Sequence, residues 1–287
     1  MYYRQRLNQF PRSTELTRKD KLYDNIRRSS SMFGNVFNFV SVSMEHSVGK
    51  CPFIVKPVSS SRGQGIFFAS KVVFLHFDFS LSSPIFVSFS LFNPLLINGY
   101  KFDLRIYVAV TSFYPLVVYV YSEGLTRVAS EKYCSDVDSR NAFVHLTNYS
   151  INKNNSNFVR WDSLFVKRII LHCSKRTYFR NDKDIVVKSL LSVQARITSA
   201  CRTTIPYIGT NYELFGFDIL VDAQLKPWLL EVNLSPSLSC DAPLDSLVKT
   251  RLICDLFNLA CVPLVNRKLA GIDSLHTFNE NENGMSF

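Results

Sequence analysis

Two short apolar runs late in the chain, Phe217–Val221 and Trp228–Val232, flank a polar turn. This pattern predicts a β-hairpin. Polar side chains interrupt the runs at Asp218, Glu231 and Asn233. The last two are two residues apart, so they point to one face of their strand. A turn centred between residues 224 and 225 places Asp218 opposite Glu231, and three oxygen-bearing side chains then converge on one face of the sheet.

Oxygen ligands gathered in this way suit a hard divalent cation. Mg²⁺ takes one or two carboxylates and completes its coordination shell with water and phosphate oxygens. A half-exposed hairpin with polar residues on its solvent-facing side gives the same pattern. The hairpin pattern alone therefore does not distinguish a metal site from an ordinary solvent-exposed strand face.

The same periodicities predict further strands and helices along the chain. Asn181 and Asp182 precede a run with helical spacing and favour the N-cap position. A chain of 287 residues with these elements forms one large domain or two to three small lobes. The predicted strands are Cys51–Lys56, Leu104–Thr111 and Leu116–Tyr121, and the predicted helices cover residues 13–26, 184–204 and 247–262.

Composition adds a preference for an anionic partner. Lys and Arg total 33 against 23 Asp and Glu, which gives a formal charge of +10. Such a charge favours nucleic acid, an anionic membrane, a polyphosphate or an acidic polypeptide without choosing among them. The seven cysteines form no C-x-x-C pair, so we expect neither a zinc site nor a disulfide framework, and we expect a reducing compartment such as the cytosol.

The chain carries no pattern that predicts a secretory signal or a membrane span. Residues 1–7 lack the apolar region of a signal peptide. Residues 66–97 are strongly apolar, but Lys71, Asp78 and Pro84 interrupt them.

A basic, glycine-containing loop follows the first predicted strand. Gly63 and Gly65 free the backbone to approach a ligand, and exposed N–H groups in such a loop bind anions. Lys56 and Arg62 add positive charge beside it. The loop is not a Walker A motif, and on its own it is more often a solvated basic turn than a phosphate-binding loop.

Two further segments carry charged or polar side chains at regular spacing. Lys101, Asp103 and Arg105 share one strand face, either as site residues or as an exposed set of mutually neutralising ion pairs. Arg127 is another cation that can reach this face. The segment His145–Lys153 is dense in donors and acceptors, as is a turn satisfied by its own Asn and Ser side chains.

In this order, the segments resemble ATP-grasp enzymes and, more closely, the glutamylase branch of the tubulin–tyrosine ligase-like family. The resemblance covers most of residues 5–262 and implies a mixed α/β, ATP-grasp-like fold with antiparallel sheets flanked by helices. It divides the chain into a shortened N-terminal lobe (1–50), a central nucleotide-binding lobe (51–100), a C-terminal catalytic lobe (101–262) and a polar tail (263–287) expected to be disordered. The matching segments are Phe10–Lys21, Ile54–Ile66, Lys101–Arg105, His145–Ser150 and the hairpin that contains Asp218.

The chemistry implied by this resemblance uses ATP and Mg²⁺. ATP phosphorylates a glutamate side chain of a tubulin C-terminal tail, and the amino group of free glutamate displaces phosphate to form an isopeptide bond. Such phosphoryl transfer depends on positioning and charge neutralisation. The implied ATP-binding residues are Lys19, Lys56, Ser61, Arg62, Gly63, Gly65, Asp103, Arg127 and Asn148, the implied catalytic residues are Lys101 and Arg105, and the implied Mg²⁺ ligands are Asp218, Glu231 and Asn233.

One segment departs from the family pattern. Where family members carry a polar and basic hinge that binds adenine, Phe86–Phe92 contains no Lys or Arg, and residues 66–93 as a whole are atypical. Three alternatives therefore remain: a ligase that adds glycine or tyrosine, a catalytically inactive microtubule-binding protein, and a basic nucleic-acid-binding protein. We expect no nucleic acid as partner because the chain lacks a recognisable nucleic-acid-binding module. The expected location is the cytoplasm and its microtubules, including those of the cilium or basal body.

Overall fold

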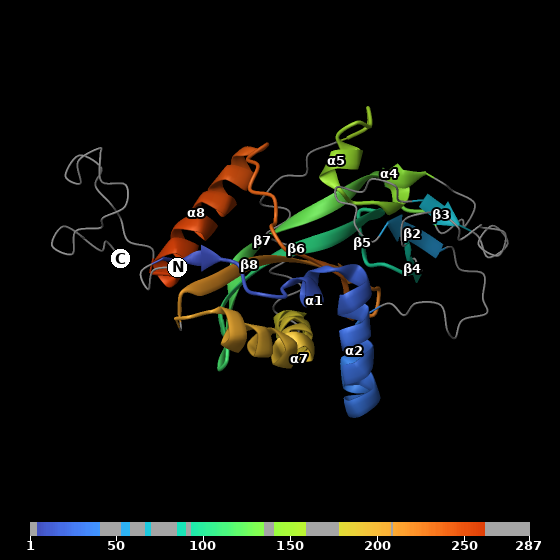
Figure 1. Ribbon diagram of the computed structural model, residues 1–287. Helices are drawn as coiled ribbons and strands as arrows, with labels where there is room; N and C mark the ends of the chain where they lie inside the picture. The colour runs from blue at the N-terminus through green and yellow to red at the C-terminus, as the bar shows by residue number, and fades with distance from the viewer. Residues whose placement is uncertain are drawn as a thin grey trace, which may run out of the picture.

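A six-stranded sheet forms the centre of the part of the chain that the structure describes (Figure 1). The structure is a computed structural model that describes residues 5–40, 53–57, 67–69, 85–89, 93–134, 141–158, 178–207 and 209–261. At residues 53–57, 67–69, 85–89 and 178–183 it describes the backbone alone. Helices flank this mainly antiparallel sheet, which confirms the predicted mixed α/β fold.

The six strands are β1 (Leu7–Asn8), β5 (Leu96–Ile97), β6 (Tyr100–Phe113), β7 (Leu116–Lys132), β8 (Asn211–Val221) and β9 (Pro227–Asn233). A separate three-stranded sheet contains β2 (Phe53–Pro57), β3 (Phe67–Ala69) and β4 (Ile85–Phe89). The helices are α1 (Thr14–Thr17), α2 (Lys19–Phe33), the 3-10 helix η1 (Gly34–Phe37), α4 (Ala142–His145), α5 (Tyr149–Asn152), α7 (Tyr178–Thr204) and α8 (Pro243–Leu259).

Strands β6 and β8 lie side by side at the centre of the large sheet. They pair antiparallel, with β7 on the outer side of β6 and β9 on the outer side of β8. The short β1 pairs with the start of β8 in the parallel direction, and β5 pairs with the start of β6. Every residue of β8 is buried, as expected for a strand with elements packed on both faces.

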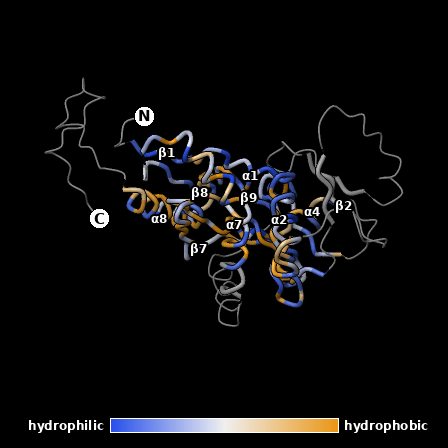
Figure 2. Tube along the Cα trace, turned by 60° about the horizontal axis from the view of Figure 1, so that its bottom comes forward, coloured by the Kyte–Doolittle hydropathy of each residue, from blue (hydrophilic) through white to orange (hydrophobic). Residues whose placement is uncertain are grey.

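The two faces of the sheet bury separate hydrophobic clusters. Figure 2 shows hydrophobic stretches gathered around β8, β9 and α7 in the middle of the molecule. Odd-numbered residues of β8 face one side and even-numbered residues the other, because side chains alternate along a strand. The α7 face contains Leu16, Ile26, Val108, Val110, Leu190, Ile197, Phe215, Phe217 and Ile219, and the α8 face contains Tyr107, Ala109, Tyr212, Leu214, Val248, Leu252 and Leu256.

The predicted elements are present, with changes at their ends. Both hairpins form, and their strands extend beyond the predicted runs because polar residues within them are also paired. The predicted N-cap at Asn181 and Asp182 is wrong: α7 begins at Tyr178, so both residues lie inside the helix. Cap preferences are weak compared with the continued backbone hydrogen bonding of a long helix. The predicted amphipathic helix near the C-terminus corresponds to α8, which begins with Pro243 in the first turn.

The register of the β8–β9 hairpin places Asp218 opposite Glu231, as predicted. The tip pairs in a different register from the predicted turn, with Val221 opposite Pro227. An irregularity between Asp218 and Ile219 then shifts the pairing by one residue. A β-bulge therefore brings the two carboxylates together, because it re-aims side chains next to it.

Several expectations concern residues outside the described part of the chain. The tail 263–287 and most of residues 66–93 lie there, and the boundaries of the three lobes remain predictions. Within the described ranges, no helix combines the length and hydrophobicity that a membrane span requires. The cysteines in the described ranges, Cys134, Cys201, Cys240, Cys254 and Cys261, are free thiols.

A buried carboxyl, Glu213, attaches the N-terminal segment to the sheet. Its Oε2 accepts a hydrogen bond of 2.9 Å from the backbone N–H of Phe10 and another from the hydroxyl of Ser13. Glu213 is 1% exposed and lies on the α7 face of β8. Burial raises its pKa to about 7, against the two hydrogen bonds, which lower it.

Replacement of this residue, Glu213→Gln, should change how stability depends on pH. The unfolded carboxyl titrates near 4.5 and the folded one near 7, so the folded state binds more protons and loses stability as pH rises between these values. A glutamine does not titrate, so the variant should gain stability relative to the parent from pH 5 to pH 8, by roughly 1.4 kcal/mol for each pKa unit crossed. Denaturant unfolding at both pH values measures this difference. Glu131→Gln is the control, since its pKa is lowered by Asn155 and Asn157, and an equal gain there would contradict the assignment.

Candidate active site

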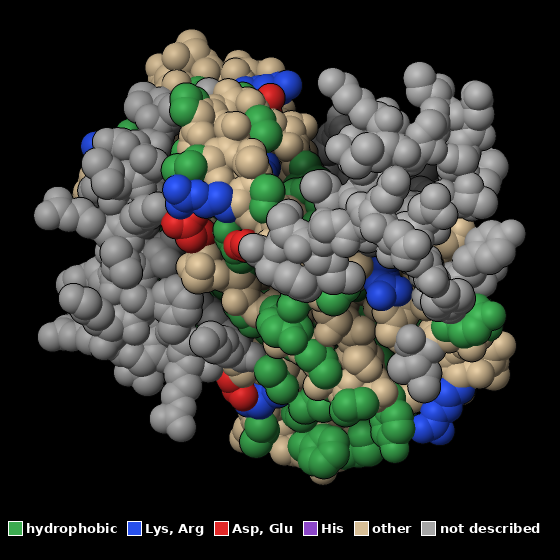
Figure 3. All heavy atoms as spheres, turned by 90° about the vertical axis from the view of Figure 1, so that its left-hand side faces the viewer, with side chains coloured by type: hydrophobic (Ala, Val, Ile, Leu, Met, Phe, Trp, Pro, Cys, Tyr) green, Lys and Arg blue, Asp and Glu red, His purple; other side chains and the backbone are tan. Residues whose placement is uncertain are grey.

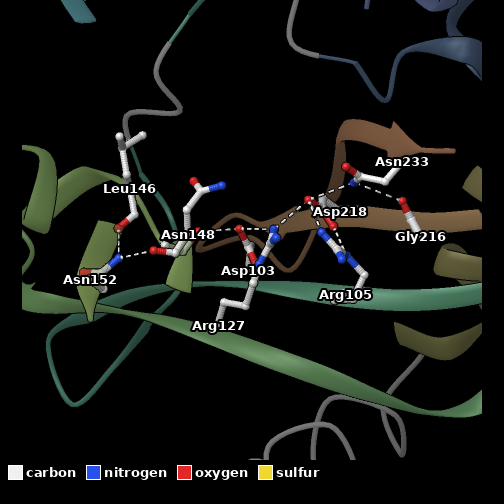
Figure 4. Close-up of polar contacts among 10 residues, drawn as sticks. Asp103, Arg105, Arg127, Leu146, Asn148, Asn152, Gly216, Asp218 and Asn233 are labelled. Atoms are coloured by element: carbon white, nitrogen blue, oxygen red, sulfur yellow. Dashed lines mark hydrogen bonds and ion pairs between the residues drawn. The ribbon is translucent and has the colours of Figure 1, made fainter. Parts of the chain in front are cut away.

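Asp218 is a buried carboxylate held by two arginines from neighbouring strands. Arg105, directly opposite it on β6, places Nε 2.5 Å from Oδ1 and donates a second hydrogen bond of 3.0 Å to Oδ2. Arg127 on β7 places a terminal nitrogen 2.7 Å from the same Oδ2. Figure 4 shows these side chains converging on one side of the sheet. The two guanidinium groups offset the cost of burying Asp218, which is 2% exposed.

Arg127 also binds Asp103, so it connects two acidic side chains. Its Nε and terminal nitrogen lie 2.6 and 2.8 Å from the two carboxylate oxygens of Asp103. Thr147, in the segment between α4 and α5, donates its hydroxyl to Asp103 as well. The charged strand face predicted from the sequence is therefore largely self-neutralising, but it is buried rather than exposed.

Glu231 faces Asp218 across the hairpin and pairs with a lysine from α2. Lys19 Nζ lies 3.1 Å from Glu231 Oε2, and both side chains are mostly buried. Asn233 completes the group, with its amide nitrogen 3.3 Å from Asp218 Oδ2. Lys19, one of the predicted ATP-binding residues, therefore contacts a hairpin that lies about 200 positions later in the sequence.

The arginines and acids change each other's proton affinity. Burial raises the pKa of Asp218, but the charges of Arg127 and Arg105 and their hydrogen bonds outweigh it and hold the pKa well below its ordinary value. Burial lowers the pKa of Arg127, but Asp103 and Asp218 outweigh it and raise that pKa. Asp218 and Arg127 therefore both stay charged near neutral pH.

The donor set fits a magnesium ion in its chemistry. Asp218, Glu231 and Asn233 offer two carboxylates and a carboxamide from facing positions of one hairpin. Three cations (Lys19, Arg105 and Arg127) neutralise the three acids Asp103, Asp218 and Glu231 in the described contacts. Hard oxygen ligands whose charge is balanced by side-chain cations can exchange those partners for a metal ion.

A glycine allows this packing. Tyr107 of β6 pairs with Gly216, two residues before Asp218. A Cβ at position 216 would lie 2.9 Å from the Cβ of Pro236 and 3.1 Å from the Cδ of Arg105. Any larger residue would displace the loop after β9 or the arginine that holds Asp218. The sequence offers this glycine but no pattern that reveals its neighbours.

The structure describes the remaining predicted site residues only in part. Lys101 is buried on the same strand as Asp103 and Arg105, and Asn148 is the residue that precedes α5. Lys56 lies in β2, where the backbone alone is described, and Ser61, Arg62, Gly63 and Gly65 lie outside the described residues. Thr147 was not predicted, although its position beside Asn148 in a dense polar segment was a usable signal.

Comparisons with known proteins give one consistent result. A model described as the tubulin-tyrosine ligase family matches residues 1–269. Tubulin polyglutamylase ttll-5 of Caenorhabditis elegans is 52% identical over an alignment of 313 positions, and the match covers 94% of this chain and 42% of the relative. Human tubulin polyglutamylase TTLL5 is 41% identical over 282 residues (89% of this chain, 22% of the relative). Mouse tubulin monoglutamylase TTLL4 is 39% identical over 293 residues (91% and 24%). The chain thus spans less than half the length of these curated relatives.

Proposed function

Because the chain belongs to the tubulin-tyrosine ligase family, whose fold is ATP-grasp-like as predicted, we propose that it is an ATP- and Mg²⁺-dependent ligase. It adds free glutamate to glutamate side chains in the C-terminal tails of tubulin. The names of its relatives, which are tubulin polyglutamylases and a tubulin monoglutamylase, support this choice of amino acid and acceptor. The same names favour a location on microtubules. We propose that these include the microtubules of the cilium or basal body.

The observation that carries the proposal is the pairing of Asp218 with Glu231, together with two arginines on the same face. Mg²⁺ bound at these oxygens would supply charge neutralisation for the phosphates of ATP. Asp218, Glu231 and Asn233 would hold the metal. Arg127 and Lys19, released from the carboxylates, would orient and neutralise phosphate oxygens.

Arg105 has a separate place in the proposal. Its guanidinium binds Asp218, and its Cδ and Nε lie beside Gly216, which Pro236 of the loop after β9 also approaches. From there it can orient the acceptor carboxylate that becomes the acyl phosphate. The leaving phosphate is then displaced by the amino group of free glutamate, which forms the isopeptide bond and loses a proton to solvent.

The described side chains on one face of the molecule favour an acidic polypeptide partner over nucleic acid. On the face shown in Figure 3, described basic side chains stand singly, and hydrophobic side chains gather in its lower part. Nucleic-acid-binding proteins instead present basic side chains as a continuous patch or stripe. The formal charge of +10 suits the acidic tails of tubulin.

The identity of the product tests the proposal. The chain is incubated with ATP, Mg²⁺ and tubulin together with labelled glutamate, glycine or tyrosine, and the tubulin tails are then analysed by tandem mass spectrometry. We expect glutamate alone to be incorporated, through isopeptide bonds to glutamate side chains. Glycine or tyrosine in its place contradicts the amino-acid assignment. Microtubule binding without incorporation of any of the three would instead support an inactive binding protein, the alternative motivated by Phe86–Phe92.

A further inference from the structure

Asn152, at the end of α5, is a fully buried asparagine whose amide uses its whole hydrogen-bonding capacity. It is 0% exposed. Its Oδ1 accepts from the backbone N–H of Ser130 at 2.8 Å and from the Ser130 hydroxyl at 2.6 Å. Its Nδ2 donates to the carbonyls of Leu146 at 2.8 Å and Asn148 at 3.0 Å (Figure 4). A side-chain amide has two donors and two acceptor lone pairs, so all four are satisfied.

These four bonds fix the backbone on both sides of Thr147. The carbonyls that Asn152 binds belong to the residues immediately before and after it. Thr147 in turn donates its hydroxyl to Asp103, the carboxylate that Arg127 also binds. In Figure 4 the Asn148 side chain points away from Asn152. Asn152 therefore contacts the turn from one side, and Asp103 of the candidate site lies on its other side.

The anchor of Asn152 is itself held in place. Ser130 lies in β7, three residues after Arg127, and its hydroxyl also accepts a hydrogen bond of 3.0 Å from Asn155. Asn155 binds Glu131 as well, at 2.9 Å. The turn is thus fastened to the same strand that supplies Arg127. Buried networks of this kind rigidify a structure when every member is satisfied.

We propose that Asn152 is a positioning residue for nucleotide binding, which it supports by holding Thr147 and Asn148 in place between α4 and α5. This inference rests on the proposed function and on the family resemblance, which implies that Asn148 and Asp103 belong to the nucleotide site. Asn152 contacts no reacting group itself, because its amide is filled by protein partners.

The test uses the full chain and a fluorescent ATP analogue with Mg²⁺. Asn152→Asp keeps the shape but replaces the NH2 group, and with it both N–H donors, by one carboxylate oxygen that faces the carbonyls of Leu146 and Asn148. We expect about tenfold weaker binding of the analogue, while the KM for tubulin stays unchanged. Asn154→Asp is the matched control, because Asn154 is an exposed asparagine two residues further on, and it should bind the analogue like the parent.

A second variant keeps the proposal testable if Asn152→Asp fails to fold. Ser130→Ala removes one of the two bonds to Oδ1 and leaves the backbone bond, so we expect about threefold weaker nucleotide binding. Unchanged nucleotide binding in a folded Asn152→Asp or in Ser130→Ala overturns the proposal, as does an equal loss of affinity for nucleotide and tubulin. If the parent chain binds no nucleotide, the proposed function fails instead, so the two failures are distinguishable.

Discussion

Asp218→Asn is expected to abolish ligation and to lower the free energy of unfolding by about 3–5 kcal/mol. The substitution keeps the size of the side chain but removes the charge that Arg105 and Arg127 share. Two guanidinium groups are then left without this counter-charge in a largely buried site. The loss is therefore larger than that of the hydrogen bonds alone, because an uncompensated buried charge is costly.

Urea unfolding and a glutamate-incorporation assay measure the two effects separately. Asp24→Asn is the matched control, because Asp24 pairs with Arg27 at 3.5 Å on the exposed surface of α2. Exposed pairs of this kind contribute about 0–1 kcal/mol. If the two variants lose the same stability, Asp218 does not have the role of a buried, doubly paired carboxylate.

Arg127→Gln is expected to lower ligation at least 100-fold and yet to raise the affinity for a metal ion in the absence of nucleotide. Arg127 donates to Asp103 and Asp218, and both carboxylates lose a positive partner in the variant. The unbalanced negative charge then favours a divalent cation at the hairpin. Ligation falls because a charge that neutralises phosphate is missing.

Electron paramagnetic resonance with Mn²⁺, a paramagnetic substitute for Mg²⁺, measures metal affinity without turnover. We expect at least tenfold tighter Mn²⁺ binding by Arg127→Gln than by the parent. The control is Arg202→Gln, since Arg202 lies over the ring of Tyr114, 4.7 Å from its centre, on α7. Weaker Mn²⁺ binding by Arg127→Gln would show that the arginine does not compete with the metal for Asp218.

The elements of the fold were predictable from the sequence because hydrophobic periodicity is a local signal. The strands around Phe217 and Trp228 and the helix over Val248 follow from apolar spacing alone. Their ends did not follow, since capping and pairing depend on neighbours distant in the chain. The start of α7 at Tyr178, before the predicted cap residues Asn181 and Asp182, is one example.

In the candidate site too, the sequence predicts the local features, and the long-range contacts depend on the folded structure. Alternation along single strands placed Asp103 with Arg105, and Glu231 with Asn233. The β-bulge that aligns Asp218 with Glu231 has no sequence signature, and the predicted turn centre reached the right pair through a different register at the tip. Long-range contacts, such as that between Lys19 and Glu231, emerge once the chain is folded.

Buried polar residues that act through others were the hardest to predict. Asn152 and Glu213 occur in segments whose residue types fit ordinary turns and strands. Their roles depend on complete burial and on partners such as Ser130 and Ser13, more than twenty positions away in the chain. Burial and pairing of this kind are properties of the folded chain.

The central claim, that the β8–β9 hairpin holds the metal of a glutamate ligase, is tested most directly by Glu231→Gln. The side chain of Glu231 is 23% exposed against 2% for Asp218, so this substitution should disturb the fold less than Asp218→Asn does. We predict that the parent incorporates labelled glutamate into tubulin only with ATP and Mg²⁺, and that the folded variant loses at least 99% of this incorporation, in the range measured for essential electrostatic groups, roughly 100- to 1,000-fold. Incorporation by Glu231→Gln at the rate of the parent would contradict the account.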